Sequence, residues 1–197
     1  AVRSLSLVRE PRSGIQRMVD YRNLGAEELG SIYESLLELM PSWDPATKTY
    51  ALTVSSGNQR KDTGSYYTPA SLVESLLDTA LDPVLDDAEK SDQPEQALLA
   101  VTVCDPACGS GHFLVGAARR IAKRIAALRT GDPEPAPAAI RSAMREVVGR
   151  CIYGVDLDPL AVELCRLALW IETMDRDLPF TFLDHKLRPG NGLIGTW

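Results

Sequence analysis

The stretch Val101-Thr-Val-Cys-Asp-Pro-Ala-Cys-Gly-Ser-Gly111 joins an apolar run to a turn that contains two glycines, and it decides the fold of this chain. The β-branched residues at 101–103 are typical of a buried strand. Gly109 and Gly111 allow a tight turn and let a ligand approach the backbone closely. An amphipathic helix is predicted from His112, with an apolar stripe of Leu114, Ala118, Ile121, Ile125 and Leu128. A strand, a glycine turn and a helix N-terminus in this order predict a cofactor site.

The residues of the turn narrow the class of cofactor. Leu114 stands where a dinucleotide-binding fingerprint has its third glycine, and the chain has no Gly-Lys-Ser/Thr phosphate loop. Asp105 ends the strand beside the turn, where its negative charge would repel a pyrophosphate and suits an ammonium group. The pattern therefore favours a nucleoside that carries an amino acid. The alternative is that Asp105 and the two glycines serve only the turn.

Strands that alternate with helices predict an α/β fold with a parallel sheet. Besides 101–105, the apolar pattern predicts strands at 151–156 and between 180 and 194. Helical spacing of apolar residues predicts further helices at 24–40, 68–80, 138–149 and from 159 onward. The last helix is expected to bury Leu160, Leu164, Leu167, Ala168 and Ile171.

Two segments are expected to lie outside this regular pattern. Residues 41–63 are predicted to form a loop or a hairpin, with a strand at 49–54. The region 82–95 carries six acids and one lysine and is predicted to be a solvated loop that repels DNA.

Composition restricts the class of protein. The 197 residues, 45% hydrophobic and 24% charged, suit one globular domain with a sizeable core, and no apolar run is long enough to span a membrane. The net charge of −6 disfavours a DNA-binding surface, because DNA affinity depends on clustered lysines and arginines. The cysteines lack the spacing of a zinc site and are expected to be buried free thiols in a reducing cytoplasm; they are Cys104, Cys108, Cys151 and Cys165.

The segment 105–114 resembles motif I of the amino-methylating DNA methyltransferases, which bind S-adenosylmethionine. Three further segments resemble the N-terminal motif, motif II and motif III in the gamma-type order of that family: Gly64–Pro69, Ile152–Pro159 and Gly190–Gly195. The segment 29–38 resembles the helix that leads into this domain in the Eco57I-like type IIG restriction-modification enzymes and in methylases of phage-defence systems. The resemblance spans residues 24–195.

The resemblance implies a class I methyltransferase fold, a Rossmann-like parallel sheet that is incomplete here and carries an N-terminal helical extension. It implies methyl transfer from S-adenosylmethionine to the exocyclic amine of adenine in DNA, in a cytoplasmic restriction-modification or phage-defence system. The family's catalytic Asn/Asp-Pro-Pro-Tyr/Phe motif, which follows motif III, does not occur in this sequence. We therefore expect a truncated enzyme, with a tail at 1–23, a helix and loop at 24–63 and the cofactor-binding part at 64–197. Neither a catalytic residue nor a metal site is assigned.

The candidate cofactor-binding residues come from these motifs: Thr68, Asp105, Pro106, Ala107, Gly109, Gly111, Asp156, Leu157 and Asn191. Asp156 ends the second strand, where a carboxylate can accept both ribose hydroxyls; the alternative is a helix cap, a role that Asp158 already suits. The resemblance implies that Leu157 packs on the adenine ring, unless it belongs to the core. It also implies a hydrogen bond between Asn191 and the adenine amine, although Asn-Gly is also a common turn pair.

The resemblance places Thr68 over the methionine carboxylate, and the same residue is expected to cap the helix that it begins. Two rival functions stay open: a methyltransferase that acts on RNA or protein, and a scaffold module that binds the cofactor without catalysis. Double-stranded DNA is expected to be bound mostly by regions outside this chain. A sheet that ends after motif III is expected to leave the strand 101–105 with a free edge, through which the chain would self-associate.

Overall fold

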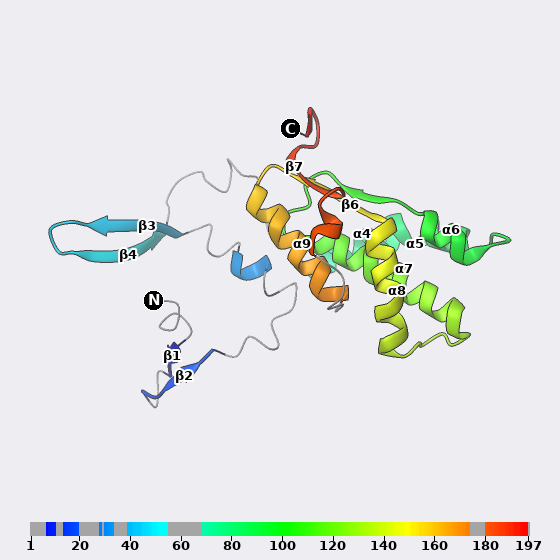
Figure 1. Ribbon diagram of the computed structural model, residues 1–197, viewed down its shortest axis with the longest axis horizontal. Helices are drawn as coiled ribbons and strands as arrows, with labels where there is room; N and C mark the ends of the chain where they lie inside the picture. The colour runs from blue at the N-terminus through cyan, green and yellow to red at the C-terminus, as the bar shows by residue number, and fades with distance from the viewer. Residues whose placement is uncertain are drawn as a thin grey trace.

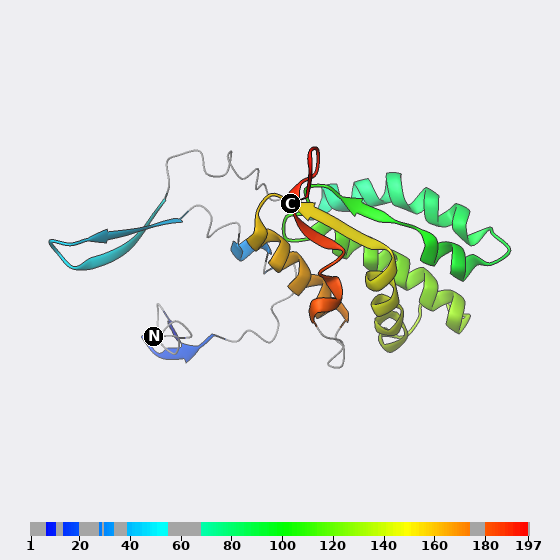
Figure 2. The same ribbon diagram turned by 45° about the horizontal axis from the view of Figure 1, so that its top comes forward.

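The computed structural model describes residues 7–10, 14–19, 28, 30–33, 39–54, 68–173 and 180–196. Helices packed on a short parallel sheet form the body of the molecule, and two antiparallel hairpins precede them in the chain (Figure 1). The first hairpin pairs β1 (Leu7–Arg9) with β2 (Gln16–Met18), within the segment expected to be a tail. The second pairs β3 (Leu39–Asp44) with β4 (Thr49–Val54), and it projects away from the body in both views (Figures 1 and 2).

The second hairpin confirms the strand expected at 49–54 and corrects the end of the helix expected at 24–40. Residues 30–33 are helical, but Leu39 already begins β3. Trp43 lies opposite Tyr50 across the hairpin, and such aromatic cross-strand pairs stabilise strands. This pairing between residues close in sequence overrides the helical spacing of the apolar residues at the end of the segment.

The parallel sheet has the order β5 (Val103–Asp105), β6 (Ile152–Asp156) and β7 (Leu187–Asn191), with β8 (Gly195–Thr196) antiparallel to β7. The three parallel strands lie side by side, coloured green, yellow and red in Figure 2. The α/β fold with a parallel sheet is thereby confirmed. Its strands lie where apolar runs predicted them, although the first begins two residues later than expected.

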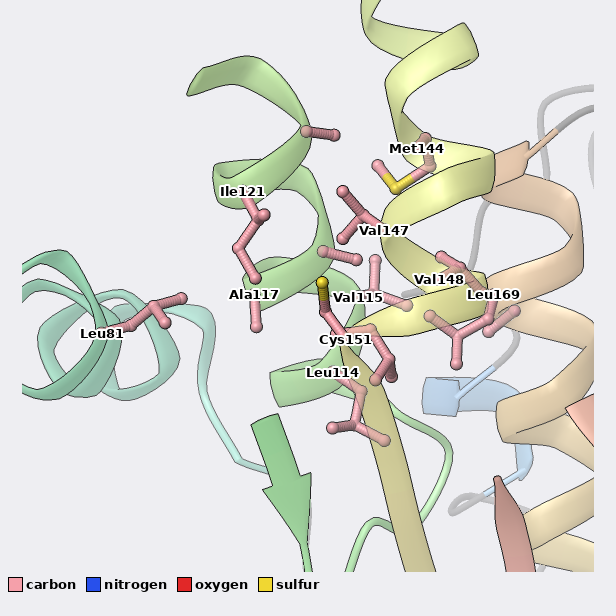
Figure 3. Packing of buried hydrophobic residues seen from close by; sticks show 14 of the residues in the cluster. Leu81, Leu114, Val115, Ala117, Ile121, Met144, Val147, Val148, Cys151 and Leu169 are labelled. Atoms are coloured by element: carbon pink, nitrogen blue, oxygen red, sulfur yellow. The ribbon is translucent and has the colours of Figure 1, made fainter. Parts of the chain in front are cut away.

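Helices α7 (His112–Thr130), α8 (Pro137–Arg150) and α9 (Pro159–Thr173) bury the sheet on one side and form the core with it. Figure 3 shows Val115 of α7 beside Val147 and Val148 of α8, with Leu169 of α9 nearby. The stripe predicted for α7 is confirmed except at its end, where Leu128 is 43% exposed because the last turn extends beyond the core. In the part of the chain that the structure describes, no helix is both long and apolar enough to cross a membrane.

The face predicted for α9 is wrong. Leu160 is 56% exposed, and of the predicted positions only Ala168 is fully buried. The buried residues are instead Ala161, Val162, Cys165, Ala168, Leu169 and Thr173. Because α9 is apolar on most sides, its periodicity does not define one face. Its small residues decide the orientation, since they let the helix approach its neighbours closely.

The solvated loop expected at 82–95 is also wrong. Helix α4 (Ala70–Leu76) continues through a π-helical turn (Leu77–Leu81) into α5 (Asp82–Glu89), and α6 (Pro94–Ala100) follows. Buried apolar residues recur at every fourth position, at Val73, Leu77, Leu81 and Leu85. In an α-helix each step of four residues rotates about 40° beyond a full turn. The wider π turn compensates for this drift and keeps all four side chains on the core.

The acids of this long helix are neutralised by arginines of α7. Arg120 contacts Glu74, Asp78 and Asp82, with Nη1 lying 2.7 Å from Asp78 Oδ1. Arg124 continues the row with Asp82, Asp86 and Glu89, with Nη1 lying 2.6 Å from Asp86 Oδ1. We call these seven residues the ion-pair ladder, in which Asp82 contacts both arginines. Acids that the sequence suggested would face solvent therefore fasten one helix to another.

The two faces of the sheet differ in burial. Ile152 and Gly154 of β6 are buried against the helices, whereas Tyr153 is half-buried on the opposite face. Cys104 lies opposite Tyr153 in the register and is exposed, so the prediction that all four thiols are buried fails at this residue. The other three cysteines are buried and free, as expected. Burial raises the pKa of Cys151 to about 11, so this thiol stays protonated.

Candidate cofactor-binding site

The candidate site lies at the edge of the sheet where the parallel strands end. Asp105 is the last residue of β5, Asp156 of β6 and Asn191 of β7. The register pairs Asp105 with Gly154, and Asp156 with Pro189, so the three ends lie next to one another. Ligands of open α/β sheets bind in the crevice outside the carboxyl ends of the strands. The fold thus places three of the sequence-predicted residues where a ligand is expected.

The turn after β5 is anchored on both sides. Asp105 Oδ1 accepts the N–H of Ala107 at 3.0 Å, and the N–H of Cys108 donates to the carbonyl of Val155 at 2.9 Å. The second contact ties the turn to β6. The turn therefore holds its backbone in place without help from a ligand.

The two glycines of the turn have different roles. Both have positive φ, 51° at Gly109 and 94° at Gly111, which disfavours any residue with a side chain. A Cβ at Gly111 would lie 2.7 Å from Cys165 Sγ, so this glycine lets α9 approach the turn. A Cβ at Gly109 would meet no atom within 4 Å. Gly109 therefore faces open space, as a backbone that contacts a ligand must.

Two backbone groups hold the carboxylate of Asp156. Oδ2 accepts the N–H of Gly109 at 2.8 Å, and Oδ1 accepts the N–H of Asp158 at 2.9 Å. Each carboxylate oxygen can accept a second hydrogen bond, so both stay available for a pair of hydroxyls. The alternative role as a helix cap belongs to Asp158, whose Oδ1 accepts the N–H of Leu160 at 2.9 Å.

The electrostatics of the site favour a cation at Asp105. Burial raises the pKa of Asp105, the hydrogen bond from Ala107 opposes this rise, and the negative charge of Asp156 adds to it. A positive group placed between the turn and these two acids would offset the cost of burying the ionised Asp105. It would also offset the repulsion between Asp105 and Asp156. An ammonium group has this charge.

Leu157 and Asn191 differ in how well their surroundings match the predicted roles. Leu157 is 59% exposed directly after Asp156, so it is free to meet an apolar ring and is not part of the core. Asn191 Oδ1 accepts the N–H groups of Leu193 at 2.9 Å and Ile194 at 3.3 Å, which is the geometry of an Asx turn. An adenine amine would have to share this oxygen with two backbone groups.

The turns after β5 and β7 are in close contact. A Cβ at Gly192 would lie 2.6 Å from the carbonyl oxygen of Pro106, so only glycine fits there. This contact brings the segments that carry motifs I and III together at the site.

Thr68 precedes α4 and is half-buried. The expected cap at Thr68 is wrong: Pro69 is the N-cap residue, and its side chain makes no capping hydrogen bond. The carbonyl of Pro69 accepts the N–H groups of Leu72 at 2.9 Å and Val73 at 3.2 Å instead. A cavity of about 370 Å³ is lined by Ala70 and Gly111 among others, which shows that the start of α4 lies near the turn. The segment 64–67 lies outside the described residues.

The helix expected at 24–40 is present at residues 30–33, but the sequence did not predict that this helical turn packs on the site. Tyr33 is buried and its hydroxyl donates to Asp158 Oδ2. A Cβ at Gly30 would lie 2.6 Å from Ser110 Oγ and 3.3 Å from His112 Cε1. The spacing of Gly30 and Tyr33, three residues apart on one helix face, was the signal available in the sequence. His112 is half-buried beside this turn.

Comparisons with known proteins show the family to which the chain belongs. The sequence pattern that defines the family described as N-6 DNA Methylase matches residues 44–187. A protein of Methanocaldococcus jannaschii named a putative type II restriction enzyme and methyltransferase is 24% identical over 216 residues, which cover 87% of this chain and 17% of that protein. The adenine-specific methyltransferase PglX of Streptomyces coelicolor is 29% identical over 150 residues, covering 76% of this chain and 10% of PglX. The chain thus spans less than a fifth of either relative. No solved structure matches it.

Proposed function

Because this chain belongs to the N-6 DNA methylase family, we propose that it forms the S-adenosylmethionine-binding part of a methyltransferase that methylates the exocyclic amine of adenine in DNA. The observation that carries this proposal is the pair of acids at adjacent strand ends, Asp105 and Asp156, with Gly109 between them facing open space. The family match favours DNA over the RNA and protein substrates that the sequence left open. The name of the archaeal relative supports a restriction-modification system, and the DNA substrate supports a cytoplasmic location.

The residues at the site suit the chemical groups of this cofactor. Asp156 has a free acceptor position on each oxygen for the two ribose hydroxyls, and the exposed Leu157 would pack on the adenine ring. Asp105 would attract the ammonium group of the methionine moiety, with the backbone of residues 106–109 lining its path. Thr68, at the start of α4, would lie toward the methionine carboxylate. When bound, S-adenosylmethionine supplies the methyl group on a positively charged sulfur.

The cofactor-binding role leaves the target amine to be positioned by other groups. The Asn-Pro-Pro-Tyr motif of the family does not occur in residues 1–197, so we assign no catalytic residue. The arginines of the ion-pair ladder are engaged with acids, and the net charge is −6, so this surface does not attract phosphates. We therefore propose that regions outside residues 1–197 hold the duplex and turn the adenine out of the stack.

Calorimetric titration of the chain with S-adenosylhomocysteine and with NAD tests the cofactor assignment. We expect binding of S-adenosylhomocysteine and none of NAD, because the turn lacks the third glycine of a dinucleotide site. NAD binding without S-adenosylhomocysteine binding would overturn the assignment.

Incubation with labelled S-adenosylmethionine and mixed-sequence duplex DNA tests whether groups outside residues 1–197 are needed to position the adenine. We expect no label in the DNA above background from this chain by itself. Clear incorporation would show that a residue within 1–197 aligns the amine, and the absence of an assigned catalytic residue would then be wrong.

A further inference from the structure

We propose that Tyr33 is a positioning residue for the candidate ribose-binding carboxylate of Asp156. In this inference, which rests on the proposed function, the helical turn at 30–33 fastens the two loops that form the cofactor site. One loop follows β5 and contains Gly109; the other follows β6 and contains Asp158. The turn lies beside the start of α9 in both views of the molecule (Figures 1 and 2).

A chain of hydrogen bonds connects Tyr33 to Asp156 through Asp158. The Tyr33 hydroxyl donates to Oδ2 of Asp158, while Oδ1 of Asp158 accepts the N–H of Leu160. Both oxygens of Asp158 are thereby fixed, one to the N-terminal turn and one to α9. The backbone N–H of the same residue donates to Asp156 Oδ1 at 2.9 Å. Whatever fixes the position of Asp158 therefore also fixes the direction of the Asp156 carboxylate.

The same helical turn also contacts the loop after β5. Gly30 is buried, and a Cβ there would lie within 2.6 Å of Ser110 Oγ, so the backbone of the turn lies directly against that loop. Ser110 follows Gly109, whose N–H donates to the other oxygen of Asp156 at 2.8 Å. Gly30 and Tyr33 thus contact the two loops whose N–H groups hold the Asp156 carboxylate.

Burial makes this arrangement effective. Tyr33 is 7% exposed, so water does not replace its hydroxyl at Asp158. A hydrogen bond to a carboxylate away from water is stronger than one between neutral groups. A carboxylate that is already oriented binds two hydroxyls with less loss of conformational freedom than a mobile one. The expected consequence is tighter binding of the ribose, with no direct contact between Tyr33 and the ligand.

A ligand pair separates positioning from general loosening of the fold. S-adenosylhomocysteine and its 2′,3′-dideoxy analogue differ only in the two hydroxyls that Asp156 would bind. The chain of residues 1–197 and its Tyr33→Phe variant are titrated with both ligands. We expect Tyr33→Phe to lower the affinity for S-adenosylhomocysteine by about 3- to 10-fold, the effect of one hydrogen bond. The affinity for the analogue should fall much less. The preference for the hydroxylated ligand should therefore fall.

Three further variants act as controls. Tyr50→Phe removes an equivalent hydroxyl from the exposed hairpin and should leave both affinities unchanged. Asp156→Ala should abolish the preference altogether. Asp158→Asn keeps an oxygen for the cap but replaces the charge-assisted bond with a neutral one, so it should lower the preference less than Tyr33→Phe does. It also provides a second measurement should Tyr33→Phe fold poorly.

The outcomes distinguish this inference from the function on which it rests. Equal weakening of both ligands by Tyr33→Phe, with the preference unchanged, would mean that Tyr33 only stabilises the fold and would overturn the inference alone. No effect of Tyr33→Phe on either ligand would also overturn it. Failure of the unaltered chain to bind S-adenosylhomocysteine would overturn the proposed function and this inference together.

Discussion

Asp156 accepts one backbone N–H on each carboxylate oxygen, from Gly109 and from Asp158. At the scale of single residues this is the most informative contact in the molecule. The two donors come from two different loops, so the orientation of the carboxylate depends on the position of both loops. Replacing this side chain therefore tests the candidate site most directly.

We expect Asp156→Ala to weaken S-adenosylhomocysteine binding by about 1–3 kcal/mol, because the ribose hydroxyls would lose their acceptors. Calorimetry on the variant measures this loss. Asp87→Ala removes a carboxylate from the exposed end of α5 and should bind the ligand as the unaltered chain does. Equal affinity of the Asp156 variant and the unaltered chain would contradict the ribose assignment.

The raised pKa of Asp105 leads to a prediction about pH. Burial, the main cause, favours the neutral acid above the ordinary aspartate value of 3.8. Only the ionised form attracts the ammonium group of the ligand, so affinity should rise as the pH increases through the raised pKa. It should fall as the pH decreases toward the raised pKa, and this fall should begin at a higher pH than for an ordinary aspartate. Asp105→Asn should bind more weakly and lose most of this dependence, and an unchanged pH profile in that variant would exclude Asp105 as the cause.

The sequence allowed some of the site to be predicted, for a physical reason. Asp105 and Asp156 could be located because an acid at the end of an apolar run marks the end of a strand, and parallel strands end at one edge of a sheet. Tyr33 could not, because its partner Asp158 lies 125 residues away and no local pattern records that contact. The capping role of Thr68 was wrong because Pro69 itself occupies the N-cap position.

At the scale of elements, the ion-pair ladder explains why an acidic segment folds as a helix. Arg120 and Arg124 lie one turn apart on α7, and between them they contact five acids, with Asp82 shared by both. The side chains of the two arginines are 19% and 23% exposed, and their removal would leave these acids to repel one another. The long helix depends on this pairing as well as on its buried leucines.

We expect Arg120→Met to lower the free energy of unfolding by about 1–2 kcal/mol at low salt, because three acids lose their shared partner. Methionine keeps the apolar part of the side chain, so the loss reports mainly on charge. High salt should reduce the difference, because it screens the remaining repulsion. Lys90→Met breaks an ion pair with Asp87 that is fully open to solvent and should leave stability unchanged. Urea denaturation of both variants at two salt concentrations measures these effects, and an equal loss at both would rule out the electrostatic explanation.

Elements with strong apolar periodicity or clear boundaries were predictable, and elements held by tertiary contacts were not. The bounds of α8 were within one residue of expectation, because Pro137 opens it and charged residues separate its apolar positions. Helix α9 was predicted in place but with the wrong face, because its apolar residues surround it. Helices α5 and α6 were missed because their acidic residues could be interpreted as solvated until the partners on α7 were known.

At the scale of the whole molecule, the sheet is covered unevenly. Within the described ranges β5 pairs with β6 alone, and Cys104 is exposed on the face away from the helices. A cavity of about 440 Å³ runs along the edge of β5, lined by apolar residues that include Leu76, Val84 and Phe113. An unpaired strand beside an apolar groove is a template for pairing with another strand.

We therefore expect the purified chain to self-associate, as size-exclusion chromatography with light scattering would show. Cys104→Lys places a charge on this strand and should shift the chain toward the monomer. Ala138→Lys adds the same charge on the exposed side of α8 and should not. A monodisperse, cooperatively melting monomer of the unaltered chain would show that the edge of β5 is covered from within.

The hydrogen bond between Gly109 and Asp156 has a consequence for the order in which contacts form during folding. Its partners are 47 residues apart, with α7 and α8 between them, so closing this loop costs entropy that only later packing repays. Contacts of this kind form late, after local helices and hairpins. The Tyr33 contact spans a still longer separation and belongs to the same late stage. The Asp156 carboxylate, the candidate ribose-binding group, is therefore oriented only when the fold is complete. Ligand binding in a refolding experiment would count the molecules that have finished folding.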